Sequence, residues 1–222
     1  SVTPLPPYEW IEYDNLDRVV ARGLFNGDTD FPSDVETPVA DRGMYSETKY
    51  SQRGLAYCSK VAVDATDSTP DFLRSDTWFD EVGRAIGQVS PNGPGVKLVY
   101  DGLGRTIAQY ITDRNGDAAP GASDNYDDVA VLASGYVRDV DLTNDRVVEQ
   151  STSAFNDDGN LVLASSTKRF HAIADTVYGE LDEDSGVASY VGYVYDGADR
   201  LVATINYGTA GTENVFEAGG DE

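Results

Sequence analysis

Hydrophobic and polar residues alternate in short runs along most of the chain. Apolar side chains occupy every second position in 96–100, 191–195 and 201–207, which is the period of a strand with one covered face. Clusters of Gly, Pro, Asn, Asp and Ser separate these runs, notably at 26–41 and 64–71, and such clusters form turns and loops. The pattern therefore predicts an all-β fold built from antiparallel β-hairpins.

A six-residue motif lies between several of these runs. Its best copy is Tyr100-Asp101-Gly102-Leu103-Gly104-Arg105. Three similar copies begin at Tyr13, Phe79 and Tyr195, and two looser ones begin at Tyr50 and Phe155. The second position is always Asp, Asn or Ser, which start turns, and the fifth is always Gly or Asp, which enter the left-handed region most easily. Each copy therefore predicts the tip of a hairpin that contains a bulge.

The hexamers supply the predicted structural turn residues. The shared Asp is interpreted as a turn residue rather than a catalytic group. The Arg at the sixth position is expected to pair with a nearby Asp or to lie over an aromatic ring, and a row of ligand-binding Arg residues is the alternative. The predicted turn residues are Tyr13, Asp14, Arg18, Phe79, Asp80, Gly83, Arg84, Tyr100, Asp101, Gly104, Arg105, Phe155, Asn156, Gly159, Tyr195, Asp196 and Arg200.

Over residues 8–207 these hexamers resemble the YD repeats of the rearrangement hot spot (Rhs) family, which also occur in teneurins and in the shells of insecticidal toxin complexes. Phe79 and Tyr100 are 21 residues apart, the usual repeat length of that family. The resemblance implies a curved, twisted β-strip or a β-solenoid-like sheet. It also implies an exported protein, extracellular or at the cell surface, because YD-repeat proteins are usually very large and exported.

The chain departs from the family pattern in several places. Some gaps between hexamers exceed the repeat length, and 142–147 keeps the Asp-Arg step of a degenerate copy without the aromatic. No Asp-Pro step occurs, so the self-cleaving end of Rhs proteins is not implied. Six or seven copies are also too few to close the hollow shell that relatives build around a cargo. A shell fragment of a polymorphic toxin is therefore only a minor alternative.

Composition divides the chain into three predicted parts. Residues 1–9 are a Pro-rich N-terminal arm, 10–207 form the repeat domain, and 208–222 are an acidic, Gly-rich tail. An arm of this kind is a plain leader or docks on a neighbouring subunit. Because the chain starts without Met, we expect it to be a piece of something longer. Within the repeat domain, the apolar residues of 170–178 fit a short helix and a pair of strands equally well.

Charge and cysteine content limit the classes of partner. The formal net charge is −23 and the isoelectric point is about 4.1, so nucleic acid and anionic membranes are not expected partners. No apolar run reaches the 18 residues that a membrane span needs. The single Cys58 excludes an internal disulfide framework.

An acidic loop at 112–128 gives a candidate metal site. Asp113, Asn115 and Asp117 alternate like the first ligands of a calcium loop, and Asp124 falls at the twelfth position. The sixth position is Ala118 rather than Gly, the twelfth is Asp rather than Glu, and no helices are expected on either side. Calcium binding is therefore the alternative to a solvated acidic loop, and no other cofactor is expected.

Catalysis has little support in the sequence. His171 is the only His, and Cys58 falls in a predicted strand, where a buried and inert thiol is usual. No zinc spacing, phosphate loop or dinucleotide fingerprint is present. Paired carboxylates are not excluded, but most Asp residues fall in turns. We therefore expect that the chain is not an enzyme.

Two functions remain. The first is a structural module that assembles into an extracellular fibre or shell, with its edge strands pairing with copies of itself or with neighbouring repeats of a larger chain. The second is an adhesion or carbohydrate-binding module for a glycan or surface receptor. Its expected binding residues are aromatics outside the repeat positions, namely Tyr57, Tyr126 and Tyr136.

Overall fold

The computed structural model describes residues 6–27, 42–67, 72–91, 93–113, 142, 145–171, 178–182 and 184–209. The all-β prediction is confirmed, since these residues form twelve antiparallel strands in one open sheet. The strands are β1 (Tyr8–Tyr13), β2 (Val19–Phe25), β3 (Arg42–Tyr50), β4 (Ala56–Ala62), β5 (Phe72–Phe79), β6 (Ala85–Val89), β7 (Gly95–Tyr100), β8 (Thr106–Thr112), β9 (Val147–Phe155), β10 (Leu161–Arg169), β11 (Gly186–Tyr195) and β12 (Leu201–Gly208).

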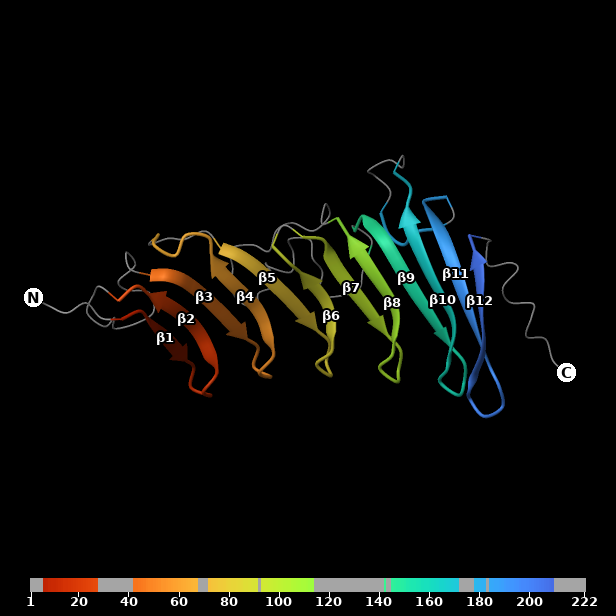
Figure 1. The fold of residues 1–222 in the computed structure, drawn as a ribbon, viewed down its shortest axis with the longest axis horizontal. Coiled ribbons are helices and arrows are strands. Elements are labelled where there is room, and N and C mark those ends of the chain that lie inside the picture. The colour runs from red at the N-terminus through yellow and green to blue at the C-terminus, as the bar shows by residue number, and fades with distance from the viewer. Residues whose placement is uncertain are drawn as a thin grey trace, which may run out of the picture. The chain divides into compact units, whose positions relative to one another are not determined.

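The strands follow one another in the sheet in the order of the chain, from β1 to β12 (Figure 1). The chain divides into two compact units, residues 1–84 with 88–92 and residues 85–87 with 93–222. Odd-numbered strands end at a hexamer and even-numbered strands begin just after one. Each hexamer is thus the connection of one hairpin, and within each unit the hexamers lie at one edge of the sheet.

The hairpins share one irregularity beside the hexamer. The first aromatic pairs with the residue six positions later, and the register shifts by one residue immediately before it, which is a β-bulge. These pairs are Tyr13–Val19, Tyr50–Ala56, Tyr100–Thr106, Phe155–Leu161 and Tyr195–Leu201. Because the bulge recurs at the same place, every strand that follows begins in the same register.

The first unit has a small core on one face of its strands. Ala21 and Tyr45 are buried there together with Ala65, which comes from the connection after β4. Trp10 and Phe72 pack against this cluster. Arg42 is also buried, donates from Nε to the Ala65 carbonyl at 2.7 Å, and lies over the Tyr45 ring. A charged side chain therefore anchors the loop that covers the core.

The core of the second unit is likewise covered by loop residues, and polar side chains on the strands bind these loops. Lys97, Tyr110 and Gln150 lie opposite one another on β7, β8 and β9, so they share one face of the sheet. Ala108, Tyr110 and Val147 form a core cluster with two loop residues, Leu142 and Leu181.

Several boundaries differ from those expected or lie outside the described residues. β1 begins at Tyr8, two residues before the expected start of the repeat domain. Most of 170–178 and of the tail is not described. The degenerate copy at 142–147 is not the tip of a further hairpin, because β8 pairs directly with β9. Among the described residues there is no helix with the length and hydropathy needed to cross a membrane.

Candidate functional site

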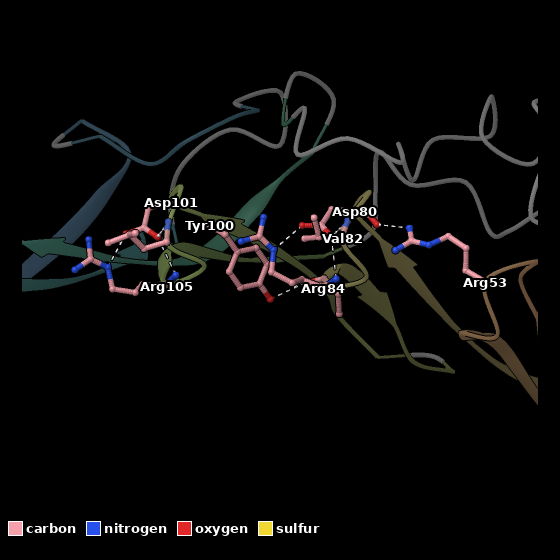
Figure 2. Close-up of polar contacts among 9 residues, drawn as sticks. Arg53, Asp80, Val82, Arg84, Tyr100, Asp101 and Arg105 are labelled. Atoms are coloured by element: carbon pink, nitrogen blue, oxygen red, sulfur yellow. Dashed lines mark hydrogen bonds and ion pairs between the residues drawn. The ribbon is translucent and has the colours of Figure 1, made fainter. Parts of the chain in front are cut away.

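The hairpin tips are the candidate site, and the Tyr100 tip shows their geometry best. Oδ1 of Asp101 accepts hydrogen bonds from the backbone N–H groups of Leu103 and Arg105, each at 2.9 Å. Oδ2 accepts from Nε of Arg105 at 2.6 Å (Figure 2). The N–H of Gly104 donates to the Asp101 carbonyl at 3.0 Å, with Gly104 at a φ of 86°. One carboxylate therefore closes the turn and fixes the Arg side chain.

The same contacts recur wherever the hexamer carries both Asp and Arg. Asp14, Asp80 and Asp196 each bind the backbone N–H and the guanidinium of the Arg four residues later. In the looser copies the second residue is Ser51 or Asn156, and its side chain accepts the backbone N–H of the sixth residue without forming an ion pair. Asp is thus needed for the ion pair, whereas Asn or Ser is enough for the turn.

The hydrogen bonds at the tips perturb the aspartates. The Arg18 and Arg200 side chains hold the pKa values of Asp14 and Asp196 below their ordinary value. At Asp80 and Asp101, desolvation is the largest single effect and raises the pKa. Hydrogen bonds from the backbone and side chain of the paired Arg outweigh it, so that both pKa values are lowered. The four carboxylates are therefore ionised and engaged at neutral pH.

Within each unit the tips also contact one another, and in three of four such contacts among the described residues an Arg side chain reaches the next tip. In the first unit the Arg18 guanidinium lies 4.7 Å from the centre of the Tyr50 ring and donates to the Ser51 carbonyl at 3.4 Å. Nη1 of Arg53 donates to the Asp80 carbonyl at 3.0 Å (Figure 2). Each hairpin of this unit is thus tied to the following one at its tip as well as along its strands.

The second unit repeats this arrangement. The Arg105 guanidinium lies 4.2 Å from the centre of the Phe155 ring. Asn160 takes the place of the Arg in the following tip, and its amide donates to Oδ1 of Asp199 at 2.8 Å. We call the series of contacts from Arg18, Arg53, Arg105 and Asn160 to the next tip the tip ladder.

The fifth position of the hexamer serves both the turn and the tip ladder. Gly83 and Gly159 have φ values of 94° and 90°. A Cβ at Gly83 would lie 3.3 Å from Nη2 of Arg53, and one at Gly159 would lie 3.3 Å from Nη1 of Arg105. Glycine therefore provides the backbone conformation and also leaves room for the preceding cation.

Sequence comparison of the hexamers missed two members of the tip ladder, Arg53 and Asn160. Arg53 is the fourth residue of its copy, while the sixth is Leu55. Its side chain nevertheless reaches the next tip, as Arg18 does from the sixth position. The absence of a sixth-position Arg, together with an Arg two residues earlier, was the signal available in the sequence.

The last tip ends the tip ladder with an exposed cation. The side chains of Arg18, Arg84 and Arg105 are 25%, 37% and 29% exposed, whereas that of Arg200 is 79% exposed. Within the part of the chain that the structure describes, Asp196 is the only polar partner of Arg200. Arg200 therefore has the geometry of its counterparts without a following tip to cover it.

Away from the tips, a buried polar row holds the loops of the second unit. Lys97 forms an ion pair with Asp145, and both side chains are at most 2% exposed. Tyr110 donates to Glu180, and burial together with that carboxylate raises the pKa of the Tyr110 hydroxyl. Oε1 of Gln150 accepts from the N–H of Leu181 at 2.9 Å. Each of these polar groups has an ion-pair or hydrogen-bond partner, and the contacts hold the loops against the strands. Their role is therefore structural.

Of the four residues expected for metal binding, the structure describes only Asp113. Asp113 accepts from Nη1 of Arg146 at 2.9 Å. Asn115, Asp117 and Asp124 lie outside the described residues, and within the described ranges no three potential ligands cluster. Calcium binding stays a prediction, and a shift in melting temperature at millimolar calcium is its test.

His171 and Cys58, for which the sequence offers no catalytic support, lie in different surroundings. His171 is exposed directly after β10 and Phe170. Cys58 is buried within β4, where burial, more than the neighbouring Asp76 carboxylate, raises its pKa to about 11. A protonated, inaccessible thiol is a poor nucleophile.

An open groove lies on the first unit beside the Tyr13 and Tyr50 tips. Its volume is about 440 Å³, and its lining includes Tyr45, Tyr50, Tyr57, Glu12 and Lys49. Tyr57 was expected as a binding aromatic, while Tyr126 and Tyr136 lie outside the described residues. The groove thus combines aromatic rings with charged groups of both signs.

Comparisons with known proteins identify no family. No family model matches the chain, and no curated protein matches it. Similar solved structures include the crystal structures of TcdB2-TccC3-Cdc42 (TM-score 0.28, 13% identity) and of TcdB2-TccC3 without its hypervariable C-terminal region (TM-score 0.29, 12% identity). Both matches cover 88% of this chain and 10% of the other, so this chain spans about a tenth of their length. At these TM-scores the likeness assigns neither a family nor a function to the chain.

Proposed function

We propose that the chain is a structural YD-repeat module without enzymatic activity, and that it forms a self-assembling segment of an extracellular or cell-surface fibre or shell. The observation that supports the proposal is the tip ladder, in which an Arg or Asn side chain binds the aromatic, backbone or acidic group of the next tip. Such contacts join one hairpin to the next and involve no chemically reactive side chain. A further copy of the chain, or further repeats of a longer one, would continue them.

The sheet itself also supports assembly. β1 and β12 are the terminal strands of the sheet order, and a terminal strand presents unpaired N–H and C=O groups that another strand can bind. β12 has exposed side chains at nearly every position. A module whose last strand is left open in this way is suited to pairing with a neighbour.

Negative-stain electron microscopy at micromolar protein tests the proposal. Uniform fibres or tubes are expected, and they should persist in a Lys168→Ala variant, because this exposed residue of β10 belongs to no tip. Monodisperse particles of single chains at all concentrations would contradict the proposal.

Carbohydrate binding is the second candidate, and the open groove of the first unit is the observation that favours it. Tyrosine rings can stack on sugar faces while Glu12 and Lys49 bind hydroxyl groups. Titration calorimetry with a panel of oligosaccharides is the test. Binding that is lost in Tyr57→Ala and kept in Tyr178→Ala, an exposed tyrosine outside the groove, would support this function. Absence of binding to the whole panel would exclude it for those sugars.

A further inference from the structure

We propose that Arg200 on the tip before β12 docks on the Tyr13 tip of a second copy of this chain, so that β12 pairs with β1 of that copy in a fixed register. The proposal rests on the proposed function, since it names the contact through which the module assembles. Four observations carry it: strand direction, register, the uncovered Arg200, and the uncovered Tyr13 tip.

Strand direction permits the contact. β2, β4, β8 and β10 each run away from a tip and pair antiparallel with an odd-numbered strand that runs toward the next tip. β12 runs away from the last tip, and β1 runs toward the first. Antiparallel pairing of β12 with β1 of a second copy therefore brings the Arg200 tip and the Tyr13 tip to the same edge.

The register of the contact follows from a pattern shared by four pairings between one hairpin and the next. At each one, the residue three positions after the end of a hexamer lies opposite the residue three positions before the next aromatic. These pairs are Ala21–Glu47, Cys58–Asp76, Ala108–Thr152 and Leu163–Gly192. The same pattern places Ala203 opposite Trp10 of the second copy, and Thr204 opposite Glu9.

The Arg200 side of the contact is already formed. Nε and Nη2 of Arg200 bind Oδ2 of Asp196 at 2.8 and 2.7 Å, which is how Arg18 is held by Asp14 while it lies over Tyr50. The Arg200 side chain is thus fixed in the conformation that its counterpart uses, so little side-chain entropy remains to be lost on docking.

The Tyr13 tip offers what Arg200 needs. The Tyr13 side chain is exposed, and among the described residues no cation lies over its ring. Asp17 occupies the fifth position at a φ of 59°, as Asp199 does in the tip where it accepts from Asn160. Arg200 would therefore meet an aromatic ring together with an acidic group of opposite charge.

The contact is heterologous, because one copy contributes Arg200 and the other contributes Tyr13. Docking leaves the second copy's own Arg200 tip available, so association continues from copy to copy. The product is a row of copies whose tip ladder runs without interruption across each junction.

Sedimentation velocity of three proteins tests the role of the cation. Arg200→Glu should weaken association by about tenfold or more, since a carboxylate would then face Asp17. Lys168→Glu changes the net charge equally on an interior strand and should alter association by less than about twofold. Equal weakening by the two variants would show a general charge effect and overturn the proposal.

Disulfide trapping tests the register independently. Glu9→Cys and Thr204→Cys are exposed positions that the register places opposite each other, and an equimolar mixture of the two single variants should give a cross-linked dimer under mild oxidation. Glu9→Cys mixed with Ala203→Cys, which lies one residue out of register, should cross-link far less. Native Cys58 is buried and does not compete.

The outcomes separate this proposal from the proposed function. Fibres or oligomers that tolerate Arg200→Glu and give no in-register cross-link would overturn this contact while leaving the structural module intact. Single chains at all concentrations would overturn both. In-register cross-linking together with the selective effect of Arg200→Glu would support both.

Discussion

The guanidinium of Arg105 lies 4.2 Å from the centre of the Phe155 ring, although 50 residues separate them in the sequence. Arg105 is held from its own side by Asp101 at 2.6 Å. The Arg105 side chain thus joins two turns. The ion pair with Asp101 orients it, and its guanidinium packs on the Phe155 ring of the next turn. Neighbouring hairpins are thereby connected at their tips, where strand hydrogen bonds have ended.

Substitution of Gly159 should destabilise the second unit selectively. Gly159→Ala introduces a Cβ at a φ of 90° and 3.3 Å from Nη1 of Arg105, and we expect a loss of about 1–2 kcal/mol in the free energy of unfolding. Gly102→Ala is the control, since its Cβ meets nothing within 4 Å, and it should change stability by less than about 0.5 kcal/mol. Urea unfolding of both variants measures the difference, and equal effects would contradict the role given to Gly159.

Removal of one partner of the buried Lys97–Asp145 ion pair should be costly. Asp145→Ala removes the carboxylate that pairs with Lys97 at a site that is 1% exposed, and a loss of about 3–5 kcal/mol is expected. Combining Lys97→Met with Asp145→Ala should recover part of that loss. Thermal unfolding of the single and double variants gives the coupling energy. A double variant less stable than Asp145→Ala alone would refute the interpretation.

The tip aspartates should make stability fall at acid pH. Asp14, Asp80, Asp101 and Asp196 have lowered pKa values in the folded chain, so the unfolded chain binds protons more readily. Their contribution is complete above the unfolded value of about 3.9 and is lost as the pH falls through the folded values.

Asp101→Asn isolates one of these contributions. Asn156 shows that an amide can form this turn, so the variant should fold while losing the ion pair to Arg105. Its free energy of unfolding should vary less between pH 4 and pH 2 than that of the wild type, as measured by urea unfolding at each pH. Parallel curves for the two proteins would show that Asp101 does not titrate in this range.

Cys58 should be unreactive in the folded chain. The residue is 2% exposed and its thiol has a pKa raised to about 11, so it should resist a disulfide reagent at pH 8 and react fully in denaturant. Ser59→Cys provides the control, because position 59 is exposed on the same strand and should react at once. Fast reaction of Cys58 in the wild type would show that β4 opens readily.

Much of the fold follows from the sequence, because two short-range signals act together. Alternation fixes which residues form strands, and the hexamer fixes where the chain turns, as at Asp101 and Gly104. Both signals depend on residues within a few positions of one another. The strand order needed no further information once each hairpin paired with the next.

The contacts that could not be predicted join residues that are close in the fold but far apart in the sequence. The aspartate partner of each sixth-position Arg was predictable, but the aromatic that Arg105 covers is set by the register between β8 and β9. The burial of Lys97 and Asp145 could not be predicted for a different reason: charged residues are usually exposed, and only the fold brings Asp145, just before β9, to Lys97 on β7.

The constant register also determines where the chain tolerates new sequence. Tyr13 and Tyr50 are 37 residues apart and Tyr100 and Phe155 are 55 apart, yet both steps have the same pairing offset. The extra residues belong to the connections between β2 and β3 and between β8 and β9, which join strand ends away from the tips. An insertion between β8 and β9 should therefore leave the spacing of the tips unchanged, which makes that edge suitable for displaying foreign peptides at regular intervals.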